Sequence, residues 1–192
     1  MRKPLPPGKF KSYLLERLRL RRYFEQPGDG RPQPQIPARV LLWSFLIGTV
    51  LRQNSFHGVE ALAHSPARQN LKISQKFGND ALGYFTERLA TGPLRQAVGG
   101  VLRLAKRNKA FDGVFWIGLI LDGTGAGRST RPGCRYCLPI KNQGEITGHN
   151  HKFSLACLTA GGLVLPADVE PYSPGRGELA ASRTMLGRLV GS

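Results

Sequence analysis

Val114-Phe-Trp-Ile-Gly-Leu-Ile-Leu-Asp122 is the stretch of sequence that decides the fold. Its first eight residues form a continuous apolar run rich in β-forming side chains, which predicts a central strand covered on both faces of a sheet. Asp122 would end this strand where the sheet meets solvent, the usual place for a catalytic or metal-binding group. Asp122-Gly123 is also a strong turn signal, so the residues alone leave both interpretations of Asp122 open.

The residues that follow Asp122 predict two further strands and a helix. A glycine-rich loop comes first, and strands over 153–159 and 163–169 then form a hairpin about Gly161-Gly162. A helix is expected over 177–190, with Leu179, Leu186 and Val190 facing inward.

The residues that precede Val114 predict helices. Lys11–Glu25 has helical character, and three prolines make 28–37 a stiff linker. The helices expected after this linker are 38–52, 56–64 with an N-cap at Asn54 or Ser55, 79–89 with an N-cap at Asn79 or Asp80, and 94–109. The sequence therefore predicts an α+β protein with a basic arm and linker (1–37), a helical region (38–110) and a β-β-β-α unit (111–192).

The charge of the chain indicates a polyanionic partner. The 192 residues include 28 Lys+Arg and 12 Asp+Glu, a formal net charge of +16, and nucleic acid is the commonest partner of soluble proteins this basic. The candidate DNA-phosphate contacts are Arg17, Arg19, Arg21 and Arg22 in the arm, and Arg103, Lys106, Arg107 and Lys109 at the end of the last helix before Val114. Cations at a helix C-terminus also favour the helix dipole, so ordinary capping is the alternative for the second group.

A second group of residues that could carry chemistry is Cys134-x2-Cys137 followed by His149-x-His151. Two thiolates and two imidazoles make a tetrahedral structural zinc site. The two histidines lie two residues apart, so on a strand both rings would share one face. Reduced thiols with incidental histidines, or a redox pair of cysteines, are the alternatives.

Cysteine count and hydropathy indicate a cytoplasmic protein. Three cysteines cannot form a disulfide framework, and prolines stand where the apolar segment of a secretory signal would be. The longest apolar run, 40–51, is too short to span a bilayer, which needs about 20 residues. We expect no membrane association.

Several stretches together resemble bacterial insertion-sequence transposases of the DDE type, over roughly residues 35–192. The stretches are Ser55-Phe-His-Gly-Val-Glu60, Asn79–Leu89, Arg107-Asn-Lys-Ala-Phe111, Ile117-Gly-Leu-Ile-Leu-Asp-Gly-Thr-Gly125, Cys134-Arg-Tyr-Cys137, Gly148-His-Asn-His151, Gly162-Leu-Val-Leu-Pro166 and the helix that contains Glu178. The most specific part is the Leu-Asp-Gly-Thr segment at Asp122 with the cysteine loop behind it.

The resemblance implies that the helical region 38–110 is the DNA-binding region, and that a ribonuclease-H-like catalytic domain begins at about Val114, with Asp122 as the first of three catalytic acids. In such enzymes two divalent ions, Mg²⁺ or Mn²⁺, bridge the carboxylates and assist in-line displacement at phosphorus. In the family the second Asp and the Glu come after the helix expected at 177–190, whereas only 70 residues follow Asp122. We therefore expect a truncated transposase that lacks both later acids and is inactive alone.

Asp168, Glu170 and Glu178 match other positions of the family pattern. Asp168 could end at the same sheet edge as Asp122 with one strand between them, about 9–10 Å away, too far to share an ion comfortably.

The sequence thus predicts a DNA-binding transposase portion that binds the ends of its element and is associated with the bacterial nucleoid. A second copy of the chain or an intact transposase is a further expected partner. The alternative is a self-contained, zinc-stabilised nucleic-acid-binding module without enzymatic activity.

Overall fold

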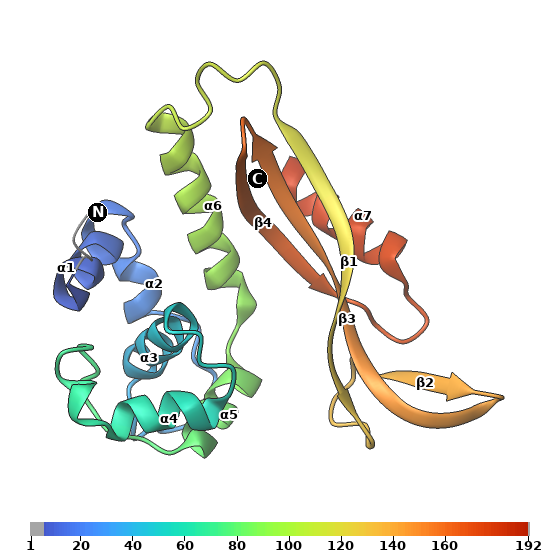
Figure 1. Cartoon of the computed structure of the whole chain (residues 1–192), viewed down its shortest axis with the longest axis horizontal. Coiled ribbons are helices and arrows are strands. Elements are labelled where there is room, and N and C mark those ends of the chain that lie inside the picture. The colour runs from blue at the N-terminus through green and yellow to red at the C-terminus, as the bar shows by residue number, and fades with distance from the viewer. Residues whose placement is uncertain (1–5, 192) are drawn as a thin grey trace. The chain divides into compact units, whose positions relative to one another are not determined.

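The structure, a computed structural model, describes residues 6–191 and divides into two compact units between Val101 and Leu102 (Figure 1). The first unit is helical, and the second contains an antiparallel sheet. This order confirms the α+β class. The helical elements of the first unit are α1 (Pro7–Ser12), a π-helical turn η1 (Tyr13–Arg17), α2 (Arg21–Glu25), α3 (Ala38–Val50), α4 (Phe56–His64), a 3₁₀ turn η2 (Pro66–Arg68), α5 (Asn79–Arg88) and the start of α6 (Thr91–Arg107).

The core of the helical unit is built around α3. Leu41, Trp43 and Ile47 are buried together with Leu82 and Phe85 of α5, and α3 is apolar on nearly all sides, as a buried helix must be. The Trp43 indole Nε1–H donates to the carbonyl of Leu71 at 2.9 Å, which satisfies the one polar atom of that side chain.

Local signals predicted the middle helices well. The Ser55 hydroxyl accepts a hydrogen bond from the Gly58 N–H at 3.0 Å and caps α4, and α4 ends just before Ser65-Pro66, as expected. The N-cap of α5 is Gly78, and Asn79 is its first helical residue, so the expected caps at Asn79 or Asp80 are wrong. α6 begins before Pro93 rather than after it, because proline is accommodated in a first helical turn.

The N-terminal segment is not a continuous helix. It breaks at Arg19, whose φ of 56° lies in the left-handed region, and Leu14, Tyr23 and Phe24 are buried. Described residues of the expected basic arm therefore belong to the helical core.

The proline-rich segment is held in place by a buried ion pair. Arg31 Nε and Nη2 donate to the two carboxylate oxygens of Asp29 at 2.9 and 2.8 Å, and Nη2 also donates to the Ile36 carbonyl at 2.8 Å. Asp29 forms a β-bridge with Leu89. The expected linker is thus packed against the end of α5.

The second unit contains a four-stranded antiparallel sheet. Its strands are β1 (Gly118–Ser129), β2 (Leu138–Asn142), β3 (Glu145–Ala160) and β4 (Leu163–Pro171), and helix α7 (Glu178–Val190) follows. β3 pairs with each of the other three strands. Met185 of α7 packs on Ala156 and Ala167, so α7 covers one face of the sheet (Figure 1). The hairpin about Gly161-Gly162 and the last helix are confirmed, but the expectation that Leu179 and Val190 face inward is wrong, because they are 66% and 84% exposed and the buried residues of α7 are Ala181 and Met185.

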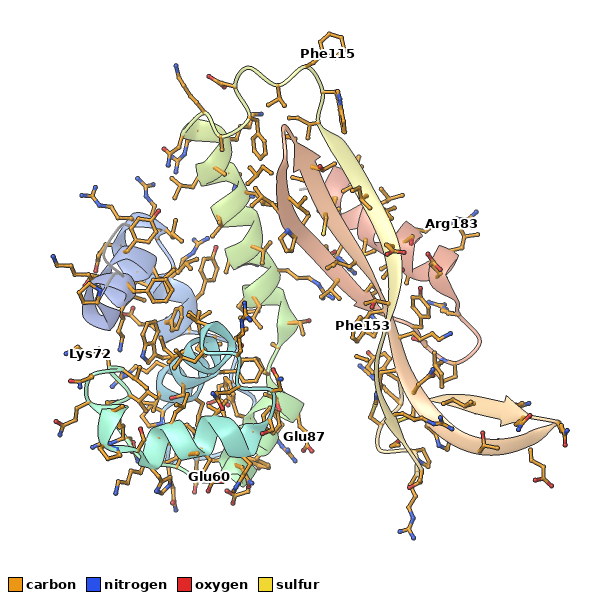
Figure 2. All side chains as sticks on the ribbon, in the orientation of Figure 1. Glu60, Lys72, Glu87, Phe115, Phe153 and Arg183 are labelled. Carbon is orange, nitrogen blue, oxygen red and sulfur yellow. The ribbon has the colours of Figure 1, made fainter. Side chains whose placement is uncertain are left out.

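The expected strand 114–121 is displaced. β1 starts at Gly118 and pairs only with β3, so it is an edge strand rather than a central one. Phe115 (Figure 2) lies before it and is fully exposed. β1 then continues for seven residues beyond Asp122, through the expected glycine-rich loop, because β3 is long enough to pair with it as far as Ser129.

Gly123 allows β1 to continue under α7. A Cβ atom there would lie 2.4 Å from the Tyr172 hydroxyl and 2.9 Å from Glu178 Oε2. This glycine therefore marks a close approach rather than a turn. β2 was not predicted, although Gln143 and Gly144, with φ of 50° and 91°, form the two-residue hairpin turn that glycine favours.

Candidate metal centre and basic surface

Cys134, Cys137 and His151 converge in the second unit. The cysteines come from the loop between β1 and β2, and His151 comes from β3. Cys134 Sγ lies 3.1 Å and Cys137 Sγ 3.5 Å from His151 Nε2, and the two Sγ atoms are 3.9 Å apart. Ligand atoms around tetrahedral zinc lie about 3.5–3.8 Å apart, given Zn–S and Zn–N bonds of about 2.3 and 2.0 Å. The three ligand atoms thus lie close enough together to hold one metal ion, and the Cys134 Sγ–His151 Nε2 distance would have to lengthen by about 0.4 Å to fit a tetrahedral zinc ion.

The cysteine loop is folded to present its sulfur atoms. The Cys137 N–H donates to the Cys134 carbonyl at 3.1 Å and closes a turn. The N–H groups of Gly133 and Cys134 donate to Cys137 Sγ at 3.2 and 3.4 Å, and that of Tyr136 donates to Cys134 Sγ at 3.3 Å. The hydrogen bond from Gly133, followed by that from Cys134, lowers the pKa of the Cys137 thiol. These bonds favour the thiolate, the form that binds metal.

His149, the fourth expected ligand, is not part of this cluster. It lies two residues before His151 on β3. Because side chains alternate between the two faces of a strand, both histidines are on the same face. Its Nδ1 atom is buried and has no hydrogen-bond partner among residues 6–191. The structure therefore brings three of the four expected ligands together and leaves a fourth coordination position for His149 or water.

The cluster of Cys134, Cys137 and His151 lies in a basic segment, residues 126–152, here called the cysteine arm. This arm comprises the end of β1, the cysteine loop, β2 and the start of β3, and it curves away from the part of the sheet that α7 covers (Figure 1). Its exposed cations, which the sequence analysis did not single out, are Arg128, Arg131, Arg135, Lys141 and Lys152. Glu145 is its single acidic residue.

Asp122 lies in the interior of β1, opposite Leu155, and is exposed. The strand continues for seven residues beyond it, so the expectation that Asp122 ends a strand where the sheet meets solvent is wrong, and so is the turn interpretation.

The later carboxylates lie on the other face of the sheet. Asp122 pairs with Leu155 of β3, whereas Asp168 and Glu170 pair with the two neighbours of Leu155, Ala156 and Ser154. Successive residues of a strand face opposite sides of the sheet. Both carboxylates bind Arg188 of α7, at 2.7 and 2.8 Å from its Nη2. The expected placement of Asp168 at the same edge as Asp122 is therefore wrong, although one strand does separate them.

Glu178 lies on the α7 face as well, because its carboxylate is next to Gly123 and not Asp122. Within residues 6–191, Cys134, Cys137 and His151 are the one group of three or more potential metal ligands that come together. Asp122 thus gains no partner carboxylate from Asp168, Glu170 or Glu178.

The eight predicted DNA-contact residues are all exposed. In the helical unit Arg21 forms ion pairs with Glu16 and Glu25, and the Arg22 guanidinium stacks on the ring of Tyr23. Arg17 and Arg19 make no ion pair within residues 6–191. Just after α6, Lys109 Nζ lies 4.0 Å from a carboxylate oxygen of Asp112. The other three predicted contacts, Arg103, Lys106 and Arg107, lie in the last turns of α6.

The sequence analysis also missed a group of basic residues in the helical unit. Lys11, Arg39 and Lys72 line a common hollow beside Trp43, although they lie far apart in the sequence.

Comparison of the chain with protein-family models, curated proteins and solved structures finds no match. In the described part of the chain, every helix is too short or too polar to cross a lipid bilayer.

Proposed function

We propose that this chain is a DNA-binding protein related to insertion-sequence transposases, in which Cys134, Cys137 and His151 hold a structural zinc ion. Its target is DNA at the ends of a mobile element, and it acts at the bacterial nucleoid. The zinc ion would fix the cysteine loop against β3, so that the cations of the cysteine arm are presented together.

The observation that carries this proposal is the coincidence of metal ligands and positive charge in the cysteine arm. Five exposed cations lie in the same segment as the cluster, against Glu145 alone. Arg135 stacks on Tyr136 at 4.8 Å from the ring centre, and a basic surface with an aromatic side chain suits contact with phosphates and bases. Structural zinc sites with Cys and His ligands are common in small nucleic-acid-binding modules.

Kinship with transposases rests on the sequence resemblance and receives support from the arrangement of the second unit. Three long antiparallel strands, β1, β3 and β4, are followed by α7 on one face, and Asp122 lies on the first of them. A ribonuclease-H-like assignment of this unit is part of the proposal.

Strand cleavage is not proposed for the chain as it stands. A two-metal reaction requires carboxylates that can bind ions about 3.5–4 Å apart. Asp168 and Glu170 are on the opposite face from Asp122 and are held by Arg188. Asp122 could bind Mg²⁺ or Mn²⁺ only weakly without partner acids.

Titration of duplex DNA at several salt concentrations, followed by fluorescence anisotropy, tests the proposal. Affinity should fall steeply with salt, since each phosphate contact contributes about −0.9 to the slope of log K against log salt. Arg131→Gln with Lys141→Gln in the arm should reduce this slope by about two. The matched control is Arg176→Gln with Arg183→Gln, two exposed arginines outside the cysteine arm; Arg183 is labelled in Figure 2. Undetectable or salt-independent binding would overturn the proposal.

A cleavage assay separates binding from catalysis. Supercoiled plasmid with Mg²⁺ or Mn²⁺ should stay intact, and Asp122→Asn should bind DNA as tightly as the native chain. Cleavage that requires Asp122 would contradict the non-catalytic role.

The second candidate is a self-contained zinc-stabilised nucleic-acid-binding module without transposase kinship, which the separation of Asp122 from the other acids favours. Selection from a random DNA library distinguishes the two. Enrichment of one motif is expected for a transposase-type reader of element ends, and retention without a motif for a general binder.

A further inference from the structure

The helical unit contains a hollow whose walls carry far more positive than negative charge. It is formed by α1, the start of α3 and the segment after η2, and it comprises two adjoining pockets of about 690 and 220 Å³ that share Lys11, Arg21 and Lys72. The cations that line them are Lys11, Arg21, Arg39, Arg68 and Lys72. The carboxylates that line them are Glu16 and Glu25.

The two carboxylates do not neutralise the other cations. Both bind Arg21. Within residues 6–191, Lys11, Arg39 and Lys72 make no ion pair. The hollow therefore has a surplus of positive charge that the described residues leave uncompensated.

Lys11 is partly buried and lies close to two other cations. Its Nζ lies 4.9 Å from the centre of the Trp43 ring and donates to the carbonyl of Lys72 at 3.5 Å. Burial first, and then the charges of Arg39 and Lys72, lower the pKa of Lys11. Like charges brought together in a partly buried place repel one another.

Arg39 adds to this charge in the first turn of α3. That turn contains no acidic residue, and the Pro37 N-cap offers no side-chain hydrogen bond. A cation there is opposed by the helix dipole, which favours negative charge at a helix N-terminus.

We propose that this hollow binds a phosphate group, and that Lys11, Arg39 and Lys72 are its ligands. The expected source of this phosphate is the DNA backbone, in which case the inference rests on the proposed DNA binding. The other possible source is a free phosphorylated molecule. A phosphate would relieve the repulsion, and the smaller pocket has room for it. Lys72 is at the surface of the helical unit (Figure 2), so a phosphate on a polymer could reach it.

The test has two arms, both made in a Trp116→Phe background so that Trp43 is the one tryptophan left. In the DNA arm, Lys11→Gln and Lys72→Gln should each weaken duplex binding about tenfold and reduce the salt slope by about one. Lys76→Gln, an exposed lysine of the same unit outside the hollow, is the matched control and should change affinity less than twofold. Thermal melts establish that each variant is folded.

In the second arm, inorganic phosphate or pyrophosphate is titrated while Trp43 fluorescence is followed. Binding next to Lys11 should change this fluorescence in the native background and in Lys76→Gln, but not in Lys72→Gln. If DNA binds, the Lys11 and Lys72 variants behave like Lys76→Gln, and pyrophosphate leaves Trp43 fluorescence unchanged, the inference fails while the proposed function stands. If DNA does not bind, but pyrophosphate changes Trp43 fluorescence in the native background and not in Lys72→Gln, the proposed function fails and the hollow binds a free phosphate. No difference between the variants in either arm overturns the inference.

Discussion

Cys134 Sγ lies 3.1 Å from Nε2 of His151, a residue on a different secondary-structure element and 17 positions further along the chain. Cys137 Sγ completes the cluster at 3.5 Å from the same nitrogen. Because these three ligand atoms lie close enough together to hold one metal ion, the cluster can be tested directly for zinc.

Purified protein should contain one zinc ion per chain, and Cys134→Ser or Cys137→Ser should lose it. Metal analysis measures the content, and a chelator should lower the Tm by roughly 5 °C or more, because the ion stabilises only the folded state. Cys157→Ser is the control, since Cys157 lies on β3 outside the cluster. Equal zinc content in all three variants would refute the site.

His149→Ala addresses the fourth coordination position. If His149 completes the site, its loss should weaken zinc affinity at least tenfold without abolishing binding, as measured by competition with a chromogenic chelator. If water fills that position, affinity should stay within about twofold of native.

Gly123→Ala should destabilise the second unit by about 1–3 kcal/mol, because the new methyl group would overlap the Tyr172 hydroxyl and the Glu178 carboxylate. Gly125→Ala, on the same strand, is the matched control, since its Cβ would meet nothing closer than the His151 carbonyl at 3.9 Å. Urea denaturation measures the free energy of unfolding of the two variants. Equal values would show that α7 can move away from β1 at little cost in free energy.

Arg188→Met should also destabilise the second unit, by about 1–3 kcal/mol. The substitution leaves Asp168 and Glu170 close together without their cation, and Asp168 is only 4% exposed. Arg183→Met, on the exposed side of α7, should change the free energy of unfolding by less than about 0.5 kcal/mol. Similar effects in the two variants would mean that Arg188 contributes no more than a surface charge.

The ion pair of Asp29 and Arg31 makes the helical unit sensitive to acid. The hydrogen bond from Arg31 outweighs burial and lowers the pKa of Asp29 below its ordinary value of 3.8. A carboxyl group with a depressed folded-state pKa stabilises the fold above its unfolded-state pKa, and this contribution is lost as pH falls through the folded-state value.

Asp29→Asn should therefore cost about 3 kcal/mol at pH 7, where Arg31 stays buried without its counter-ion. The difference from the native chain should shrink as the pH falls below about 3.8. Urea denaturation followed by Trp43 fluorescence in the Trp116→Phe background reports on the helical unit alone. A difference that does not depend on pH would contradict the assigned role of Asp29.

Local signals in the sequence determined the class of the fold and most of its helices. The Ser55 cap, the stop at Pro66 and the turn at Gly161-Gly162 act within a few residues, so they can be recognised without knowing what lies nearby in space. The pairing of Cys134 and Cys137 with a histidine was also visible as a spacing.

Only the tertiary structure decided which residues meet. It selects His151 rather than His149 for the cluster, because the loop reaches β3 at that point. It extends β1 through the glycines after Asp122, since β3 pairs with these residues and Gly123 has no side chain to collide with Glu178 of α7. It places Asp168 on the face opposite Asp122, because register across two strands sets the facing of every side chain. It also gathers Lys11, Arg39 and Lys72 around Trp43. All four outcomes depend on contacts between segments distant in the sequence, and the free energy of those contacts is not encoded in any local pattern.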